Sequence, residues 1–309
     1  MDRICAECDH KLPPDSYTAA QWYKGPGLSR CVGCVHGRRV DNAYLALTDS
    51  GRYNDASQAA FTGVSLDHPF STGAFRNVAK GKYTEGARKG EDCVCKWFKA
   101  GSVFEDDFFE LDIKAVDKAV EIINRFNQLH VVNRQIKMNI PEVWSVSRCN
   151  IQSFRDVKTL QEPFIENYRK FNSNTGWNNS SIAWGRVMQA LSHFSYHVTG
   201  GKYVLCDLQG GIYPHEVILS DPVILSRTRQ FGVTDLGPEG ISTFFREHFC
   251  NEFCRPHWAR PARTCQHFEP RMSTSMLKHS VSVAPSRRGQ KHVPMPVVGE
   301  EEVDKDPRY

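Results

Sequence analysis

The sequence predicts an α+β fold in which a small metal module precedes one larger domain. The 309 residues are 40% hydrophobic and 24% charged, which is sufficient to bury a sizeable core. Strand-like apolar runs dominate the first half of the region 63–260, and amphipathic helical patterns occur in both halves. Eleven cysteines are unusually many for this length, and some stand at metal-ligand spacing.

The globular elements follow in order along residues 63–260. A strand is expected at 91–98, and a helix over 112–127 carries Ile113, Val116 and Ile123 on one face. Further strands are expected at 140–146 and 159–165. A helix is expected around 184–191 that ends near 193, and a strand at 203–208 follows a glycine turn. A last helix is expected to begin at Pro238.

Composition excludes several classes of protein. Lysine plus arginine exceed aspartate plus glutamate by 39 − 35 = 4, with a pI near 8.4, too small an excess to indicate nucleic-acid or membrane binding. No apolar run approaches membrane-spanning length, and the residues 1–5 do not resemble a signal peptide. We expect an intracellular protein, cytoplasmic or nuclear.

The chain divides into four segments by composition. Residues 1–38 carry clustered cysteines, 39–62 are polar and aperiodic and are interpreted as a linker, and 63–260 form the globular region. From 261 to 309 serine, proline, arginine and acidic residues predominate, which is typical of a disordered tail. A tethered tail has a high effective concentration at a neighbouring site, so its serines are candidates for self-modification.

The N-terminal segment has the spacing of a structural zinc site. Two Cys-x-x-Cys pairs, separated by 22 residues, would each direct two thiolates at one ion. The expected ligands are Cys5, Cys8, Cys31 and Cys34. His10 or His36 could replace a cysteine, and the alternatives are unrelated thiols or a redox pair. Such a segment would fold only with its metal.

Charged residues in strand-like runs indicate a second kind of chemistry. Lys96 shares a strand face with Val94 and Phe98, a costly place for an ammonium unless an anion meets it, although a lysine reaching water from an edge strand is the alternative. Asp207 and Gln209, two residues apart, would present oxygen ligands suited to Mg²⁺. A second carboxylate follows at Asp221, and phosphoryl transfer requires one acid on a metal and another near the acceptor.

Another set of soft ligands lies near the end of the globular region. His248, Cys250 and Cys254 fall within seven residues, with the two cysteines one helical turn apart. A fourth zinc ligand must come from elsewhere. His193 is the expected donor, which would join two helices, and His197 is the competing one. The glycine-rich run 232–240 is a weak signal, and it follows no clear strand, so a dinucleotide fold is not favoured.

Over residues 69–258 the sequence resembles the alpha-kinase family of atypical protein kinases. The matching motifs are Pro-Phe-Ser-Thr-Gly-Ala-Phe-Arg at 69–76, Val-Cys-Lys at 94–96, Glu-Pro-Phe-Ile-Glu at 162–166, Lys-Phe-Asn-Ser-Asn at 170–174, Gln-Ala-Leu-Ser-His at 189–193, Cys-Asp-Leu-Gln-Gly at 206–210, Ser-Asp-Pro at 220–222, Thr-Asp-Leu-Gly at 234–237 and His-Phe-Cys-Asn at 248–251 with Cys254. The N-terminal cysteine segment lies outside the resemblance.

The resemblance implies a two-lobed kinase fold, with lobes at about 63–160 and 161–260 and a zinc ion in the second. It assigns roles to residues by match. Lys96 and Arg76 would hold nucleotide phosphates, Asp207 and Gln209 would ligate Mg²⁺, and Asp221 would be the catalytic aspartate. Glu162 and Phe164 would belong to the lobe-connecting stretch that meets adenine, and Gly237 and Gly240 would serve ATP or peptide. The zinc ligands would be His193, His248, Cys250 and Cys254. Lys118 lies near the place where relatives have an acidic partner for the lysine, and Glu121 is the alternative.

The resemblance therefore implies an ATP- and Mg²⁺-dependent serine/threonine protein kinase with one structural zinc ion, and the N-terminal cysteine spacing predicts a second. Its partners would be a protein substrate and a partner of the N-terminal module. The rival interpretations are an inactive pseudokinase scaffold and an adaptor built around the zinc module. Because Lys96, Asp207, Gln209 and Asp221 are all present, the active kinase is favoured.

Overall fold

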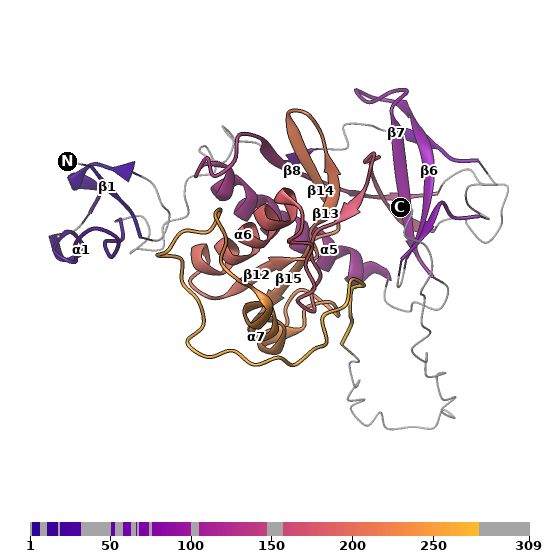
Figure 1. Cartoon of the computed structure of the whole chain (residues 1–309). Helices are drawn as coiled ribbons and strands as arrows, with labels where there is room; N and C mark the ends of the chain where they lie inside the picture. The colour runs from indigo at the N-terminus through magenta and orange to yellow at the C-terminus, as the bar shows by residue number, and fades with distance from the viewer. Residues whose placement is uncertain are drawn as a thin grey trace, which may run out of the picture.

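The computed structural model describes residues 2–6, 11–17, 19–31, 51–52, 58–62, 66, 68–73, 76–99, 105–146 and 157–277. A small N-terminal unit stands at one end of the molecule, a helical and sheet-containing body in the middle, and a twisted sheet at the other end (Figure 1). The N-terminal unit contains β1 (Arg3–Ile4), β2 (Lys11–Leu12), a 3₁₀ turn (Pro14–Ser16) and α1 (Ala19–Trp22). Tyr17, Cys5 and Cys31 form its buried centre.

The distal sheet is antiparallel and six-stranded. It comprises, in spatial order, β4 (Gln58–Ala60), β6 (Arg76–Glu85), β7 (Asp92–Phe98), β10 (Lys158–Pro163) and β9 (Glu142–Ser145), with β5 (Ser71–Thr72) also paired to β6. The central strand β7 is buried along most of its length, which accounts for its nearly continuous apolar sequence. This sheet supplies Arg76, Lys96 and Glu162 to the site described below.

The central body contains a second sheet and a strand pair. The five-stranded sheet runs β11 (Arg169–Lys170), β13 (Gln209–Ile212), β14 (Glu216–Ser220), β8 (Gln135–Asn139) and β3 (Gly51–Arg52), and β8 is parallel to both its neighbours. β12 (Tyr203–Cys206) pairs only with β15 (Val223–Ser226) among the described strands.

Three long helices complete the body: α5 (Glu105–Asn127), α6 (Ala183–Val198) and α7 (Gly237–Glu247). The apolar stripe of α5 packs with β8 and α6 into the largest hydrophobic cluster, where Phe126, Phe194 and Trp258 contact one another. α7 begins at Gly237 with Pro238 in its first turn, and Phe244 and Phe245 face a second cluster. None of the helices in the described parts of the chain is long and apolar enough to cross a membrane.

Several expectations on boundaries were wrong. Residues 51–52 and 58–60 are strands of the two sheets and not a linker, because their backbone groups complete sheet edges. The helix expected to end near 193 continues to Val198. The expected division near residue 160 is also wrong, since α5 and β8 share the core of the central body whereas β10 belongs to the distal sheet. Because the apolar stripe of α5 is buried against the central body, α5 belongs to that body and not to the distal sheet.

The chain does not leave the domain at residue 261 as expected. Its orange-to-yellow continuation after α7 wraps around the central body (Figure 1). The backbone of Cys265 exchanges hydrogen bonds with the Ser242 hydroxyl, and His267 N donates to Thr243. The disorder expected from 261 is therefore wrong for 261–277, because polar groups of the body bind this segment. Residues 278–309 lie outside the described part.

Gly210 is placed where a side chain cannot fit. Its φ is +155°, and an added Cβ would lie 1.9 Å from the carbonyl oxygen of Ile218 on the paired strand. We expect Gly210→Ala to reduce the free energy of unfolding by about 3 kcal/mol, through steric overlap and backbone strain. Gly90→Ala is the matched control: its φ is +89°, but the added Cβ meets no described atom within 4 Å, so about 1 kcal/mol is expected. Urea unfolding measures both, and equal losses would contradict the clash.

Candidate active site

A buried lysine joins the two sheets. Lys96 on β7 is 6% exposed, and its Nζ lies 2.5 Å from Asp221 Oδ2 and forms an ion pair with Glu162 on the adjacent strand β10. Burial opposes the charged ammonium, but Asp221 and Glu162 outweigh it and raise the pKa of Lys96. The anion required by an inward-facing lysine is therefore supplied by two carboxylates of the chain itself.

Glu162 is the partner of Lys96 that the sequence did not identify. Its side chain is 3% exposed, and burial raises its pKa although Lys96 opposes this. The expected region for that partner, the helix carrying Lys118 and Glu121, is wrong: these two residues pair with each other on α5. The antiparallel pairing of β7 and β10, which aligns Lys96 with Leu160, brings Glu162 within reach. The identity of this partner of Lys96 therefore follows from the register of the strands and not from the local sequence.

Arg76 and Asp112 extend the charged cluster. Arg76 binds Asp112 on α5, and its second terminal nitrogen lies 3.8 Å from Asp221 Oδ1. Burial raises the pKa of Asp112 to about 6, although Arg76 opposes the shift. Asp112 stands next to Ile113 at the edge of the apolar stripe of α5, and no pattern in the sequence assigned it to the site.

Asp207 and Asp221 are held together by a β-hairpin. β13 pairs with β14 so that Gln209 lies opposite Ser220, which places the two aspartates at one end of the hairpin. Both adopt a left-handed backbone, with φ of +58° for Asp207 and +50° for Asp221. For Asp221, the charges of Lys96 and Arg76 outweigh burial and lower the pKa. It therefore stays ionised at neutral pH.

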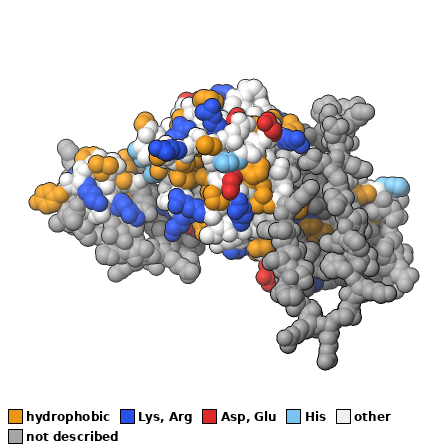
Figure 2. Space-filling view, turned by 90° about the horizontal axis from the view of Figure 1, so that it is seen from below, with side chains coloured by type: hydrophobic (Ala, Val, Ile, Leu, Met, Phe, Trp, Pro, Cys, Tyr) orange, Lys and Arg blue, Asp and Glu red, His pale blue; other side chains and the backbone are white. Residues whose placement is uncertain are grey.

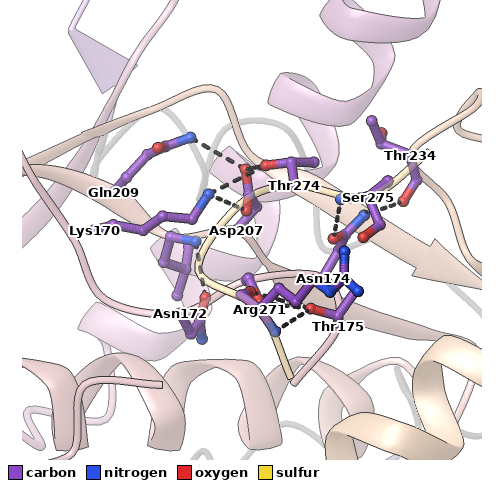
Figure 3. A network of polar contacts seen from close by, with 12 residues as sticks. Lys170, Asn172, Asn174, Thr175, Asp207, Gln209, Thr234, Arg271, Thr274 and Ser275 are labelled. Atoms are coloured by element: carbon purple, nitrogen blue, oxygen red, sulfur yellow. Dashed lines mark hydrogen bonds and ion pairs between the residues drawn. The ribbon is translucent and has the colours of Figure 1, made fainter. Parts of the chain in front are cut away.

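Asp207 is buried, and three side chains contact its carboxylate. Lys170 Nζ lies 2.8 Å from Oδ1, while the Thr274 hydroxyl at 2.7 Å and the Gln209 amide at 3.2 Å donate to Oδ2 (Figure 3). Burial raises the pKa of Asp207 despite Lys170. The Asp207–Gln209 juxtaposition expected from their spacing is present. Lys170 and Thr274 were not anticipated at this carboxylate.

The second cluster of soft ligands is also assembled. The donor atoms of His193, His248, Cys250 and Cys254 all lie within 4.8 Å of one another. Burial lowers the pKa of His193 to about 4 and of His248 to about 3, so both rings are neutral as metal ligands require. The other ring nitrogens face Ala259 O at 3.2 Å and Gln189 Oε1 at 3.3 Å, as outer partners of metal-bound imidazoles do.

The surroundings of this cluster differ from the expectation in one respect. His248, Cys250 and Cys254 lie after the end of α7 and not on a helix, so the site joins α6 to the following loop. Asn251 shapes that loop: its side chain accepts from Phe253 N and its carbonyl accepts from Cys254 N. His197, the competing donor, instead accepts a hydrogen bond from Ala259 N. The donor set of two imidazoles and two thiols fits a closed tetrahedral zinc site.

Of the N-terminal ligands, only Cys5 and Cys31 are described. Both are buried, and Cys31 N donates a hydrogen bond to Cys5 Sγ at 3.2 Å. Cys8, Cys34, His10 and His36 lie outside the described residues. The four-cysteine site stays a prediction.

The remaining predicted site residues are Phe164, Gly237 and Gly240. Phe164 follows β10, where Lys80 Nζ lies 3.9 Å from its ring centroid and Phe70 packs edge-on. Gly237 and Gly240 belong to the first turn of α7: an added Cβ would meet Arg229 at Gly237, and Leu236 and Leu225 at Gly240. The geometry gives both glycines a packing role.

The metal cluster generates a test. We expect Cys254→Ala and His193→Ala to hold about one zinc per chain less than the unmodified protein and to unfold at lower temperature, because the ion joins α6 to the loop after α7. His197→Ala removes a neighbouring buried histidine outside the ligand set and is expected to keep its zinc. Elemental analysis and thermal unfolding measure the two effects, and full zinc content in both ligand variants would contradict the assignment.

Known proteins share this architecture. The profile of the alpha-kinase family matches residues 71–254. Two relatives from Dictyostelium discoideum are alpha-protein kinase vwkA, 38% identical over 30% of this chain, and alpha-protein kinase 1, 32% identical over 64%. These matches span only 15% and 14% of the two relatives.

Solved structures agree in fold. An alpha kinase from Entamoeba histolytica has a TM-score of 0.54 and 21% identity over 68% of this chain and 82% of that chain. The alpha-kinase domain of myosin-II heavy chain kinase A in complex with AMP-PNP has a TM-score of 0.55 and 21% identity over 64% and 86%. Since the family profile covers more than half of the sequence, the chain belongs to the alpha-kinase family.

Proposed function

We propose that this chain is an ATP- and Mg²⁺-dependent protein kinase that transfers the γ-phosphoryl group of ATP to serine or threonine hydroxyls of a protein substrate. The observation that carries the proposal is the convergence of charged residues from both sheets: Lys96 and Arg76 contact Asp221, whose charge also acts on the nearby Asp207. Membership of the alpha-kinase family and the AMP-PNP complex of a structural neighbour support it.

Lys96 and Arg76 are the cations for the nucleotide phosphates. Both already face carboxylates, and Glu162 holds the ammonium from the side of β10. When phosphates replace Asp221 as the partner, Glu162 keeps Lys96 charged and oriented. This pairing of a strand lysine with a buried glutamate fixes the cation before the nucleotide arrives, which lowers the cost of organising the transition state.

Asp207 and Gln209 fit the proposed magnesium site. The Gln209 amide nitrogen lies 3.2 Å from Asp207 Oδ2, and the two side chains carry carboxylate and amide oxygens, the ligand types that Mg²⁺ prefers. Bound there, the ion would neutralise charge that develops on the phosphates. The chain contributes the strained turn that aims Asp207 inward and the hairpin that sets Gln209 beside it.

Asp221 is the proposed catalytic aspartate. Its pKa is lowered by Lys96 and Arg76, so the carboxylate is ionised and can accept a hydrogen bond from an acceptor hydroxyl, orient the oxygen and take its proton as the new phosphate ester forms. Residues 162–166 are proposed to contact adenine. Of their backbone, Pro163 O already accepts from Asn139 and Phe164 N donates to Asp92 O.

The finer assignments are also proposals. The two zinc ions are structural, and the N-terminal module is assigned to a protein partner. The pseudokinase alternative is not favoured, because each charged residue expected of an active site is present and in contact with another. Modification of the tail serines is an expectation for the active enzyme, and three of them, at 280, 282 and 286, lie outside the described residues.

Removing the metal ligand tests the reaction. We expect Asp207→Ala to reduce phosphoryl transfer to a generic basic protein substrate by about 10³-fold or more, while zinc content stays unchanged. Lys96→Ala is expected to be similarly inactive because the phosphates lose their cation. Asp117→Ala removes an exposed carboxylate of α5 and serves as the control. Turnover near the unmodified level in either site variant would mean that the active site lies elsewhere.

The ionisation of Asp112 tests the role of Arg76. With a pKa raised to about 6 by burial, Asp112 is ionised above that pH and protonated below it, where its ion pair with Arg76 is lost. We expect kcat/KM to rise with pH through about 6. Asp112→Asn should abolish this rise of kcat/KM with pH. It should also reduce activity about tenfold at pH 7.5, since a hydrogen bond to a charged group contributes about 1.5 kcal/mol. If kcat/KM of Asp112→Asn still rises with pH through about 6, the titration belongs to another group.

A further inference from the structure

A segment after the last helix lies against the charged cluster. Residues 271–277, called the strap here, contain no helix or strand and follow the loop that leaves α7 (Figure 1). The lower face of the central body, along which this part of the chain runs, shows apolar side chains among lysines and arginines (Figures 1 and 2). None of the sequence motifs named above includes the strap, so its contacts are an independent indication of what this face binds.

Two buried side chains of the body hold the strap by its main chain. The Asn174 amide accepts a hydrogen bond from Ser275 N at 2.9 Å and donates one to Ser275 O at 2.7 Å. The Thr175 hydroxyl accepts from Arg271 N at 3.0 Å and donates to Arg271 O at 3.1 Å. Asn174 is 0% and Thr175 2% exposed. Since every residue except proline carries both backbone groups, the same two side chains can hold other polypeptides.

An apolar side chain anchors the end of the strap. Leu277 is partly buried and packs on the second hydrophobic cluster, which residues of α7 help to form. Its backbone N–H donates to Val233 O at 2.8 Å. Met272 and Met276, by contrast, are 56% and 42% exposed. The strap is therefore held by hydrogen bonds along its backbone and by burial of Leu277 at its end.

Between these anchors, Thr274 enters the charged cluster. Its hydroxyl donates to Asp207 Oδ2 at 2.7 Å and accepts from Lys170 Nζ at 3.1 Å (Figure 3). Lys170 also lies 2.8 Å from Asp207 Oδ1, and the charge of Asp221 acts on Asp207. In phosphoryl transfer to a protein, a carboxylate holds the acceptor hydroxyl and cations neutralise the transferring group. Thr274 has both kinds of neighbour, as an acceptor hydroxyl requires.

We propose that this surface is the acceptor-polypeptide site of the kinase and that the strap occupies it as a substrate mimic. Thr274 takes the position of the phosphoryl acceptor, and Leu277 fills an apolar subsite three residues after it. A protein substrate binds by displacing the strap, and it carries a serine or threonine followed at the third position by a large apolar residue. The inference rests on the proposed kinase function and names the substrate class of the same site.

Loosening the strap tests the competition. Leu277→Asp places a charge against the second hydrophobic cluster, and Met276→Asp places the same charge at the exposed neighbouring position. The substrate is a synthetic peptide with the sequence of residues 268–277. Because strap and peptide exclude each other, the Leu277→Asp chain should show a KM about tenfold lower, with kcat unchanged. The Met276→Asp chain should keep the KM of the unmodified chain, and thermal unfolding checks that both variants are folded.

Variants of the peptide test the apolar subsite. They are offered to the Leu277→Asp chain, and mass spectrometry locates the phosphate, which we expect on the threonine of the peptide. Replacing the leucine of the peptide by aspartate should lower kcat/KM about tenfold, because the apolar burial is lost. Replacing the neighbouring methionine, Met276 of the chain, by aspartate should leave kcat/KM nearly unchanged.

Binding tests the same surface without turnover. In the absence of nucleotide, fluorescence anisotropy of the labelled peptide should show about tenfold tighter binding to the Leu277→Asp chain than to the unmodified chain. Equal binding to these two chains would overturn the proposal. So would equal use of the two aspartate-substituted peptides, or a KM that the Leu277→Asp and Met276→Asp chains share.

The two proposals fail separately. If the Leu277→Asp chain binds the peptide more tightly but no phosphate reaches the peptide or a generic basic protein, the surface remains a polypeptide site and the proposed kinase function fails. If the chain phosphorylates a generic basic protein while Leu277→Asp changes neither peptide binding nor KM, the kinase function stands and the role of the strap fails.

Discussion

The site depends on one buried ion-paired lysine. Lys96 comes from the distal sheet, and its two carboxylate partners come from different sheets, so a single ammonium joins the two halves of the domain. Burying such a charge is costly unless its partners are well placed, and removal of one partner leaves an uncompensated charge. The relative position of the sheets is therefore restricted by electrostatics as well as by packing.

The same constraint explains the hairpin that bears the aspartates. A carboxylate can reach Lys96 only if the chain reverses sharply after β14, and Asp221 adopts a left-handed backbone to do so. Asp207 makes the equivalent turn after β12. Strain at these positions is sustained because the β13–β14 pairing and the close approach at Gly210 leave the backbone no alternative. Lys96, Arg76 and the two aspartates are thus organised by one network.

The His193 cluster stabilises the other side of the central body. It joins α6, which lies in the main hydrophobic cluster, to the loop that leads from α7 toward residues 271–277. Arg260 reinforces this loop by donating to His248 O at 3.0 Å. The path of the chain after residue 260, which ends with the contact of Thr274 on Asp207, starts from the loop that carries His248, Cys250 and Cys254.

Local pattern determined much of this protein. Amphipathic spacing predicted α5, continuous apolar character predicted β7, and residue chemistry at short spacing predicted the Asp207–Gln209 pair and three of the four ligands of the His193 cluster. α5 and β7 depend on residues a few positions apart, whose relative geometry follows from helix or strand alone. The Asp207–Gln209 pair and the group His248, Cys250 and Cys254 lie at a turn and in a loop, where short separation along the chain keeps the side chains close. Conversely, the partners of Lys96 and Arg76, the membership of α5 and β8 in the central body, and the docking of 271–277 were decided by tertiary structure. Glu162 lies 66 residues from Lys96 in sequence and Thr274 lies 67 from Asp207. Contacts at such separation depend on sheet register and on which buried polar groups remain to be satisfied, and neither is encoded in any local window.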